Sequence, residues 1–159
     1  MRKYISFGML LLLAVSASAS DDKTDRATLR GIKGVCTIVE VTGPGVGKDR
    51  LQVEVDGRLT GAGILVDKSA TPCVYLNVRP LQAMGRNNKP IGLYAVELTL
   101  HLFQTVALTR DPSTKAYAPT WSVSNLATVP ADDLEPAARQ ITIDLTDKFV
   151  EAFRSANPK

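Results

Sequence analysis

Histidine and cysteine are scarce in this chain of 159 residues, which contains one histidine, His101, and two cysteines, Cys36 and Cys73. Two cysteines without a histidine cluster do not make a zinc site. The acidic residues are scattered or lie at expected helix starts, so they indicate neither a calcium loop nor a pair of catalytic carboxylates. A single histidine also lacks the orienting partner and the nucleophile that a catalytic base needs. We therefore expect no metal, no cofactor and no catalytic residue.

Long apolar runs are absent after the first residues of the chain. Arg2 and Lys3 precede an apolar run over residues 4–15, and small residues follow up to Ala19, which is the pattern of a secretory leader. The run is shorter than the roughly 20 residues of a spanning helix, and no cysteine stands directly behind it to carry a lipid. We predict a signal peptide over residues 1–19, a periplasmic or extracellular protein, and no membrane span or lipid anchor.

A strong charge excess is also missing. The chain has 19 basic and 16 acidic residues, and the leader contributes two of the basic residues and no acid, which leaves 17 against 16. This near-neutral balance gives no electrostatic indication of binding to nucleic acid or to an anionic membrane face. The length suits one domain, which we place at residues 31–159, behind a polar and flexible segment at residues 20–30.

The most regular pattern lies between Ile91 and Arg110. Large side chains occupy every second position, and polar or smaller ones take the positions between them, as in a strand with one buried face. The buried set is Tyr94, Val96, Leu98, Leu100, Leu102, Gln104, Val106 and Leu108. Because this strand exceeds the usual length, we expect a bulge within it. A turn at residues 111–113 leads to an antiparallel partner strand at Thr120–Ala127.

The other elements complete a two-layer arrangement. We predict strands at Val35–Val41, 64–66 and Cys73–Val78, a helix at Arg50–Ala62 capped by Asp49 and Gly63, an exposed loop at Pro80–Pro90, and a second helix after Pro130. The second helix carries the apolar stripe Ala138, Ile141, Leu145, Phe149, Ala152 and Phe153. Two striped helices and a single-faced sheet are complementary surfaces. The predicted fold is an α+β two-layer sandwich, with both helices on one face of a mainly antiparallel sheet, in the order β-α-β-β-β-β-α.

A glycine-rich stretch, Gly43–Lys48, lies between a strand and a helix and superficially suggests a phosphate-binding loop. That motif needs a glycine five residues before its second glycine and a hydroxyl after the lysine, whereas this chain has Thr42 and Asp49 at those places. A carboxylate at position 49 would repel a phosphate. We interpret the stretch as a connecting loop.

The two cysteines each lie at the start of a predicted strand. If those strands are neighbours, Cys36 and Cys73 could form a disulfide, which an exported location permits. The alternative is two small buried apolar residues. Strand adjacency does not follow from one sequence, so both possibilities stay open.

Three features carry a resemblance: the helix run from Leu51 to Ile64, the Thr120-Trp121 pair, and the closing stretch Phe149–Lys159. With them the chain resembles a family of small exported bacterial proteins of unknown function. Its element order is loosely similar to the N-terminal domain of the Tol translocation protein and to the lipopolysaccharide-assembly lipoprotein. The resemblance implies an envelope location and, at the level of fold alone, an assembly or binding role.

The sheet face opposite the helices offers aromatic and polar side chains, which binding surfaces favour. The candidate binding residues are Tyr75, Asn77, Arg79, Glu97, Thr99, His101, Phe103 and Trp121. We interpret the protein as a non-enzymatic binding or envelope-assembly module that holds a protein or envelope component. The alternative is a small ligand carrier or enzyme with a pocket between sheet and helices. The first requires a filled core and an open sheet face, and the second requires a cavity in the core.

Overall fold

The computed structural model describes residues 23–158, so the predicted leader and cleavage site lie outside the described residues. The elements, in chain order, are α1 (Lys23–Ala27), β1 (Gly34–Val41), α2 (Lys48–Gly61), β2 (Leu65–Val66), β3 (Cys73–Met84), β4 (Pro90–Leu108), β5 (Asp111–Pro130), the 3-10 turn η1 (Ala131–Asp133) and α3 (Leu134–Ala156). Apart from the short α1, this is the predicted order of strands and helices.

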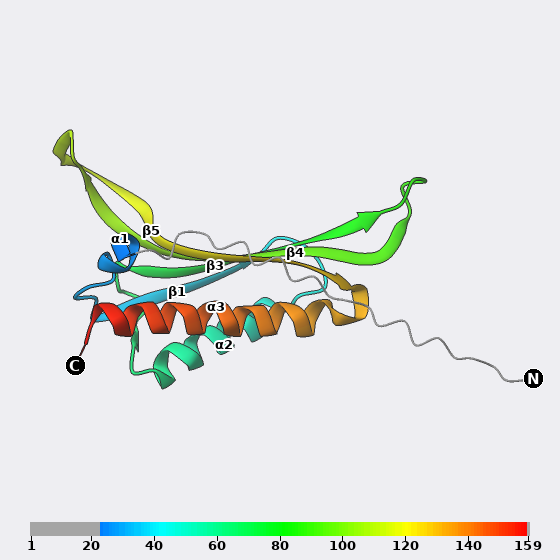
Figure 1. Cartoon of the computed structure of the whole chain (residues 1–159), viewed down its shortest axis with the longest axis horizontal. Helices are drawn as coiled ribbons and strands as arrows, with labels where there is room; N and C mark the ends of the chain where they lie inside the picture. Colours follow the sequence, from blue (N-terminus) through cyan, green and yellow to red (C-terminus); the bar gives the residue numbers. More distant parts are fainter. Residues whose placement is uncertain (1–22, 159) are drawn as a thin grey trace, which may run out of the picture.

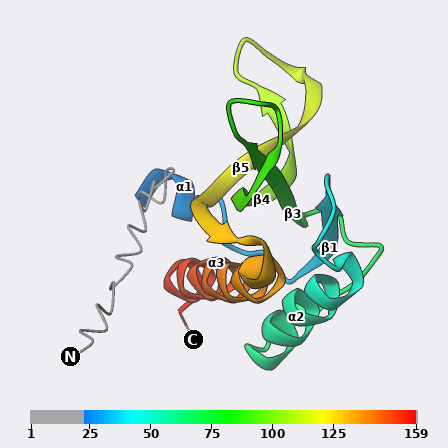
Figure 2. The same cartoon turned by 90° about the vertical axis from the view of Figure 1, so that its right-hand side faces the viewer.

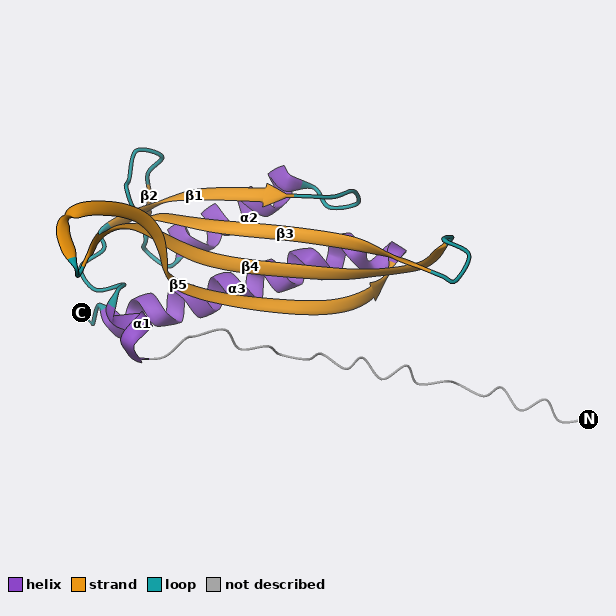
Figure 3. Ribbon diagram, turned by 90° about the horizontal axis from the view of Figure 1, so that it is seen from above, coloured by secondary structure: helices purple, strands orange, loops and turns teal. Residues whose placement is uncertain are grey.

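Five strands form one sheet in the order β2-β1-β3-β4-β5. The pairs β3–β4 and β4–β5 are antiparallel, whereas β1 runs parallel to both β2 and β3. The parallel pairs arise because the chain crosses from β1 to β2 and β3 through α2 on one side of the sheet. Seen from above, β1, β3, β4 and β5 lie side by side with both long helices behind them (Figure 3).

Helices α2 and α3 both cover the same face of the sheet (Figure 1). The predicted alternation is confirmed in the middle of β4, where Val96, Leu98, Leu100 and Leu102 are each 0% exposed. Towards the ends of the strand, the other members of the predicted buried set are only half-buried: Tyr94, Gln104, Val106 and Leu108. Beneath them, the ring of Phe149 in α3 meets the indole of Trp121 in β5 edge to face, with centroids 5.3 Å apart. The end-on view shows the helices as a second layer below the sheet (Figure 2). The two-layer α+β architecture is therefore as predicted.

The ends of α2 differ in part from the prediction. The helix starts at Lys48 rather than Arg50, and its N-cap is Gly47, without a side-chain cap. The predicted N-cap, Asp49, is wrong because the helix begins one residue before it, which places Asp49 in the first turn. The N–H of Gly47 donates to the carboxylate of Glu135 in α3, at 2.7 Å. At the other end Gly63 has φ +82° and follows the C-cap, as expected for a glycine that ends a helix.

The predicted loop at Pro80–Pro90 is wrong for most of its length, because β3 continues to Met84 and only residues 85–89 form the turn. Pro80 pairs with Val96 within the sheet. The carbonyl of Val78 accepts from the N–H of Thr42, on the β1 side of β3. Two residues later, Pro80 directs its backbone to that same side, where β1 has already ended. Its missing N–H therefore costs no hydrogen bond of the sheet.

The β4–β5 hairpin is longer than predicted. The turn falls at residues 109–110, and Asp111 and Pro112 already belong to β5. The predicted turn at residues 111–113 therefore starts two residues too far along the chain. The register shifts between Leu102 and Phe103 and again near the tip, which confirms the expected irregularity in this long ladder. At the first shift β5 carries one extra residue, Thr120, and beyond it the hairpin bends away from the helices (Figure 1).

The N-terminal segment is more structured than its polar composition indicates. In the described part of the segment predicted to be flexible, residues 23–30, α1 packs beside β5 and α3 and Leu29 is 0% exposed. The hydroxyl of Thr28 donates to the carbonyl of Thr120 at 3.2 Å, and the amide of Gln104 donates to the carbonyl of Thr28 at 3.0 Å. One buried apolar residue and these two hydrogen bonds thus hold this segment against the end of the core.

Replacing Leu29 with alanine should therefore destabilise the protein by about 2–5 kcal/mol, the range for a fully buried leucine. The matched control is Leu81→Ala, because Leu81 is 61% exposed and exposed substitutions usually change stability by less than about 0.5 kcal/mol. Urea denaturation followed by circular dichroism measures both. Equal midpoints for the two variants would show that residues 23–30 do not belong to the folded domain.

Candidate functional site on the open face of the sheet

The sheet face turned away from α2 and α3, which we call the open face, carries seven of the eight predicted binding residues. Tyr75, Asn77 and Arg79 come from β3, and Glu97, Thr99, His101 and Phe103 come from the neighbouring β4, in the register Tyr75↔His101, Asn77↔Thr99 and Arg79↔Glu97. Trp121 is the exception. It pairs with the buried Leu102 and is 1% exposed, so it fills the core and does not belong to this surface.

An apolar depression, which we call the aromatic pocket, lies at one end of the open face. Its volume is about 350 Å³. The lining residues are Ile38, Cys73, Tyr75, Phe103 and Tyr117. The rings of Phe103 and Tyr117 are stacked at 5.5 Å, and Tyr75 meets Phe103 edge to face at 5.8 Å. Ile38 and Tyr117 are 46% and 54% exposed, so the pocket is open to a partner.

Two of the pocket residues, Ile38 and Tyr117, were not predicted from the sequence, and the reason is physical. Tyr117 lies in β5 on the tip side of the extra residue Thr120, and it lines the pocket together with Ile38 of β1. Ile38 lies on β1, which borders β3 only because the chain makes a parallel crossover. Neither the bend nor the strand order has a local sequence signal, so the sequence predicts only the members of β3 and β4.

The floor of the aromatic pocket is closed by a disulfide. Cys36 of β1 and Cys73 of β3 are direct partners in the parallel register, with Cα atoms 4.4 Å apart, and their sulfurs are bonded. Of the two possibilities left open by the sequence, the bridge is the one formed. It ties β1 to β3 at the point where the pocket sits, and both cysteines are buried.

Beyond the pocket, the open face becomes polar. The hydroxyl of Tyr75 donates to the carboxylate of Glu40, and Arg79 faces Glu97 at 3.9 Å. The side-chain oxygen of Asn77 and Nδ1 of His101 are buried without a hydrogen-bond partner among the described residues. A buried polar atom without a partner is costly, so a ligand that donates to Asn77 or bonds to the imidazole would gain from contact here.

His101 is half-buried, and its burial lowers the pKa of the imidazole below the usual value of 6.5. Its ring meets Phe103 at 5.6 Å. The other residues around it are Ser122, which is its partner on β5, and Asp25, Pro119 and Thr120, which line a small depression beside it. No group of three or more metal-binding side chains occurs within residues 23–158. The arrangement can bind and donate hydrogen bonds, and it presents no activated nucleophile.

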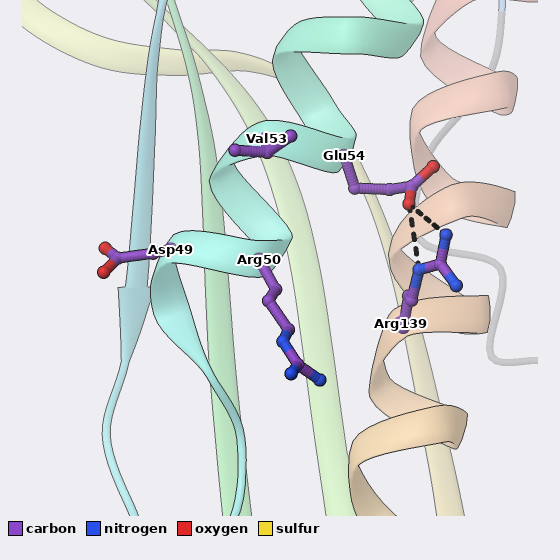
Figure 4. A pocket seen from close by; sticks show the side chains of 5 residues that line it. All are labelled: Asp49, Arg50, Val53, Glu54 and Arg139. Carbon is purple, nitrogen blue, oxygen red and sulfur yellow. Dashed lines mark hydrogen bonds and ion pairs between the residues drawn. The ribbon is translucent and has the colours of Figure 1, made fainter.

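A larger depression between α2 and α3 on the opposite side of the molecule is occupied by ion pairs (Figure 4). The carboxylate of Glu54 accepts from Nε of Arg139 at 3.0 Å and from Nε of Arg58 at 3.3 Å. The hydrogen bond from Arg139, followed by that from Arg58, lowers the pKa of Glu54. Arg58 also contacts both carboxylate oxygens of Asp147 at 2.8 Å. These charges compensate one another, so they join the helices and do not form an anion or cation site.

The glycine-rich stretch before α2 is not a phosphate site either. The helix N-terminus, where a phosphate would bind, already holds the carboxylate of Glu135 on the N–H of Gly47. A side chain at Gly43 would come within 2.9 Å of Pro80, so this glycine permits a close approach to β3. The predicted connecting role of this stretch fits these contacts.

No family model and no curated protein matches the chain. Among solved structures, it is similar to a PelC dodecamer from Paraburkholderia phytofirmans, with 13% identity over 75% of this chain and 88% of that chain and a TM-score of 0.44. It is also similar to a minor lipoprotein from Acinetobacter baumannii, with 13% identity over 78% and 94% of the two chains and a TM-score of 0.40. Rare lipoprotein B from Shewanella oneidensis matches with 12% identity over 76% and 94% and a TM-score of 0.41. Two of these three are lipoproteins, and likeness at this level assigns neither a family nor a function.

Loss of the disulfide should lower the free energy of unfolding by about 4 kcal/mol, the chain-entropy value for a loop closed across 37 residues. Because one bond is lost in each case, Cys36→Ala, Cys73→Ala and the double variant should be destabilised by similar amounts. Urea denaturation with and without reductant measures the effect. A wild-type midpoint that reductant leaves unchanged would contradict the bridge.

The stability of the protein should fall as the pH drops through the unfolded-state pKa of histidine, about 6.5. Burial lowers the pKa of His101 in the folded state, so between the two pKa values the unfolded chain binds the proton more readily. The loss stops below the folded pKa. His101→Gln should remove this component of the pH dependence. Since His101 is the single histidine, its NMR titration gives the folded pKa directly, and a midpoint at or above 6.5 would contradict the prediction.

Proposed function

We propose that this protein is a non-enzymatic module of the bacterial envelope that holds a protein partner on its open face, with the aromatic pocket as the anchoring point. The observation that carries the proposal is the pocket itself, an apolar depression built by four strands and left uncovered by the helices. Apolar and aromatic side chains gathered in a depression are what binding hot spots are made of. An apolar side chain of the partner would enter between Ile38 and Tyr117.

The polar part of the open face supports the same role. A bound chain segment that leaves the pocket along β3 and β4 would pass Asn77 and His101, whose buried polar atoms have no hydrogen-bond partner in the part of the chain that the structure describes. A donor from the segment would satisfy the oxygen of Asn77 and would add direction to the apolar anchor. The predicted leader supports an envelope location for such a partner.

The alternative of a carrier or enzyme with an internal pocket has less support. Such a protein needs a cavity between the sheet and the helices, and large side chains fill that space. Trp121, Phe149, Leu98 and Leu145 are each at most 1% exposed. Within residues 23–158, no helix is long and apolar enough to cross a membrane.

Site-specific photo-crosslinking in the native host tests the proposal. A photoreactive phenylalanine analogue at Ile38 or Tyr117 should give discrete adducts with a partner, because both side chains border the pocket and are exposed. The matched control is the same analogue at Val53, which is 73% exposed on α2 in the other layer. Adding Phe103→Ser, which removes a pocket wall, should reduce the adducts at least several-fold.

Two results would contradict the proposal. One is an equal set of adducts from Val53 and from the pocket positions, which would indicate collision and not binding. The other is unchanged crosslinking in the Phe103→Ser variant, provided that its thermal melting shows a folded protein. Adducts with a small apolar molecule instead of a protein would indicate a ligand carrier whose binding site is the aromatic pocket on the open face.

A further inference from the structure

The end of the sheet opposite the aromatic pocket presents a second unusual surface. The β3–β4 hairpin, residues 79–93, projects beyond the helix layer (Figure 1). Four of the large apolar side chains that are exposed in this protein gather on it: Leu81 at 61%, Met84 at 49%, Ile91 at 54% and Leu93 at 37%. Isolated exposed apolar residues are ordinary, whereas a concentration of them marks an interaction site.

The charge of this hairpin is one-sided. It contains Arg79, Arg86 and Lys89 and no carboxylate, and the whole stretch over residues 68–96 is free of aspartate and glutamate. Arg79 faces Glu97 at 3.9 Å, but no ion pair within residues 23–158 involves Arg86 or Lys89, which flank the tip. The charge balance of the chain is near neutral, but this hairpin is locally positive.

The tip is held in a defined shape. The N–H of Gly85 donates to the carbonyl of Lys89 at 2.8 Å, and the N–H of Asn88 donates to the carbonyl of Gly85 at 3.0 Å. Asn88 has φ 54°, a left-handed conformation suited to a tight turn, and Gly92 has φ 74° within β4, between the two pairs where the register shifts. The four apolar side chains are thus presented on a short, hydrogen-bonded hairpin and not on a loose loop.

We propose that the β3–β4 hairpin docks this protein on the surface of an anionic phospholipid bilayer, with Met84 and Ile91 entering the interface and Arg86 and Lys89 at the level of the lipid phosphates. Apolar side chains flanked by long cationic ones are how a peripheral element lies in a membrane interface. The complementarity of charge favours anionic lipid, and the projecting, convex shape favours a fluid surface over a protein groove. This inference is independent of the proposed function, since it uses the other end of the sheet.

Co-sedimentation of the purified protein with vesicles tests the proposal. Binding should occur to phosphatidylcholine vesicles that contain phosphatidylglycerol, should weaken with added salt, and should be much weaker with phosphatidylcholine alone. The double variant Arg86→Gln/Lys89→Gln should bind about 30-fold more weakly, roughly fivefold for each cation near an anionic surface. Arg110→Gln/Lys115→Gln, which neutralises two cations at the opposite hairpin, is the matched control and should bind like the wild type.

A second variant separates insertion from simple charge attraction. Tryptophan at the tip, Asn87→Trp, should show a blue-shifted and enhanced fluorescence with the anionic vesicles, because the native Trp121 is buried and should not respond. Met84→Ser/Ile91→Ser should abolish that shift and weaken binding at least tenfold, while Leu126→Ser, a matched exposed site on β5, should not. Thermal melting of each variant checks that it is folded.

The proposal fails if the protein does not bind the anionic vesicles, or if the control pair weakens binding as much as the hairpin pair does. It also fails if the hairpin variants lose a protein partner in the crosslinking experiment while vesicle binding is unaffected, because the surface would then be a protein interface. Loss of vesicle binding with intact crosslinks at Tyr117 would separate the two sites and leave the proposed function standing.

Discussion

The whole structure depends on one constraint: the sheet has a single apolar face, and that face must be covered. In β4 the side chains that point to the helices are the large aliphatic ones, each of them 0% exposed between Val96 and Leu102. The two long helices, α2 and α3, both lie on this side (Figure 2), and the ion pairs Glu54–Arg139 and Arg58–Asp147 join them across their contact. Because covering the apolar face uses both helices, the other face of the sheet stays uncovered and can carry binding chemistry.

Local periodicity made the layers of this fold predictable. The period of two correctly assigns the inward residues of β3 from Val74 to Val78 and those of β4 from Val96 to Leu102, and the helical stripe of α3 is buried as expected at Ala138, Ile141, Leu145 and Phe149. Towards the ends of β4, the residues predicted to be buried are only half-buried. The errors arise where the burial or the strand placement of a residue depends on a segment that is distant in the sequence. Pro80 is accepted in β3 because β1 has ended beside it, Trp121 is buried because it pairs with Leu102, and Leu29 is buried because α1 returns to the end of the core. No local pattern contains this information.

The residues of the candidate site likewise fall into a group that local sequence predicts and a group that it does not. Its members on β3 and β4 follow from alternation, because neighbouring strands with known facing residues must share a surface. The aromatic pocket also needs Ile38 from a parallel neighbour, Tyr117 from beyond a bulge, and the register that bonds Cys36 to Cys73. These three depend on strand order and on one extra residue, Thr120, which only the assembled sheet reveals. A sequence can therefore indicate a binding face while leaving its most apolar point unidentified.

Total charge was a poor guide to surface chemistry in this protein, because opposite charges are separated along the fold. The helix layer contains paired carboxylates and guanidinium groups, whereas the projecting hairpin lies within the acid-free stretch over residues 68–96. The hairpin residue Ile91 and the pocket residue Phe103 are twelve positions apart on one strand, up to about 40 Å at the rise of a β-strand. A molecule docked by its hairpin would thus hold the aromatic pocket well away from the lipid surface. The single rigid sheet that separates the two sites allows both to be occupied at once.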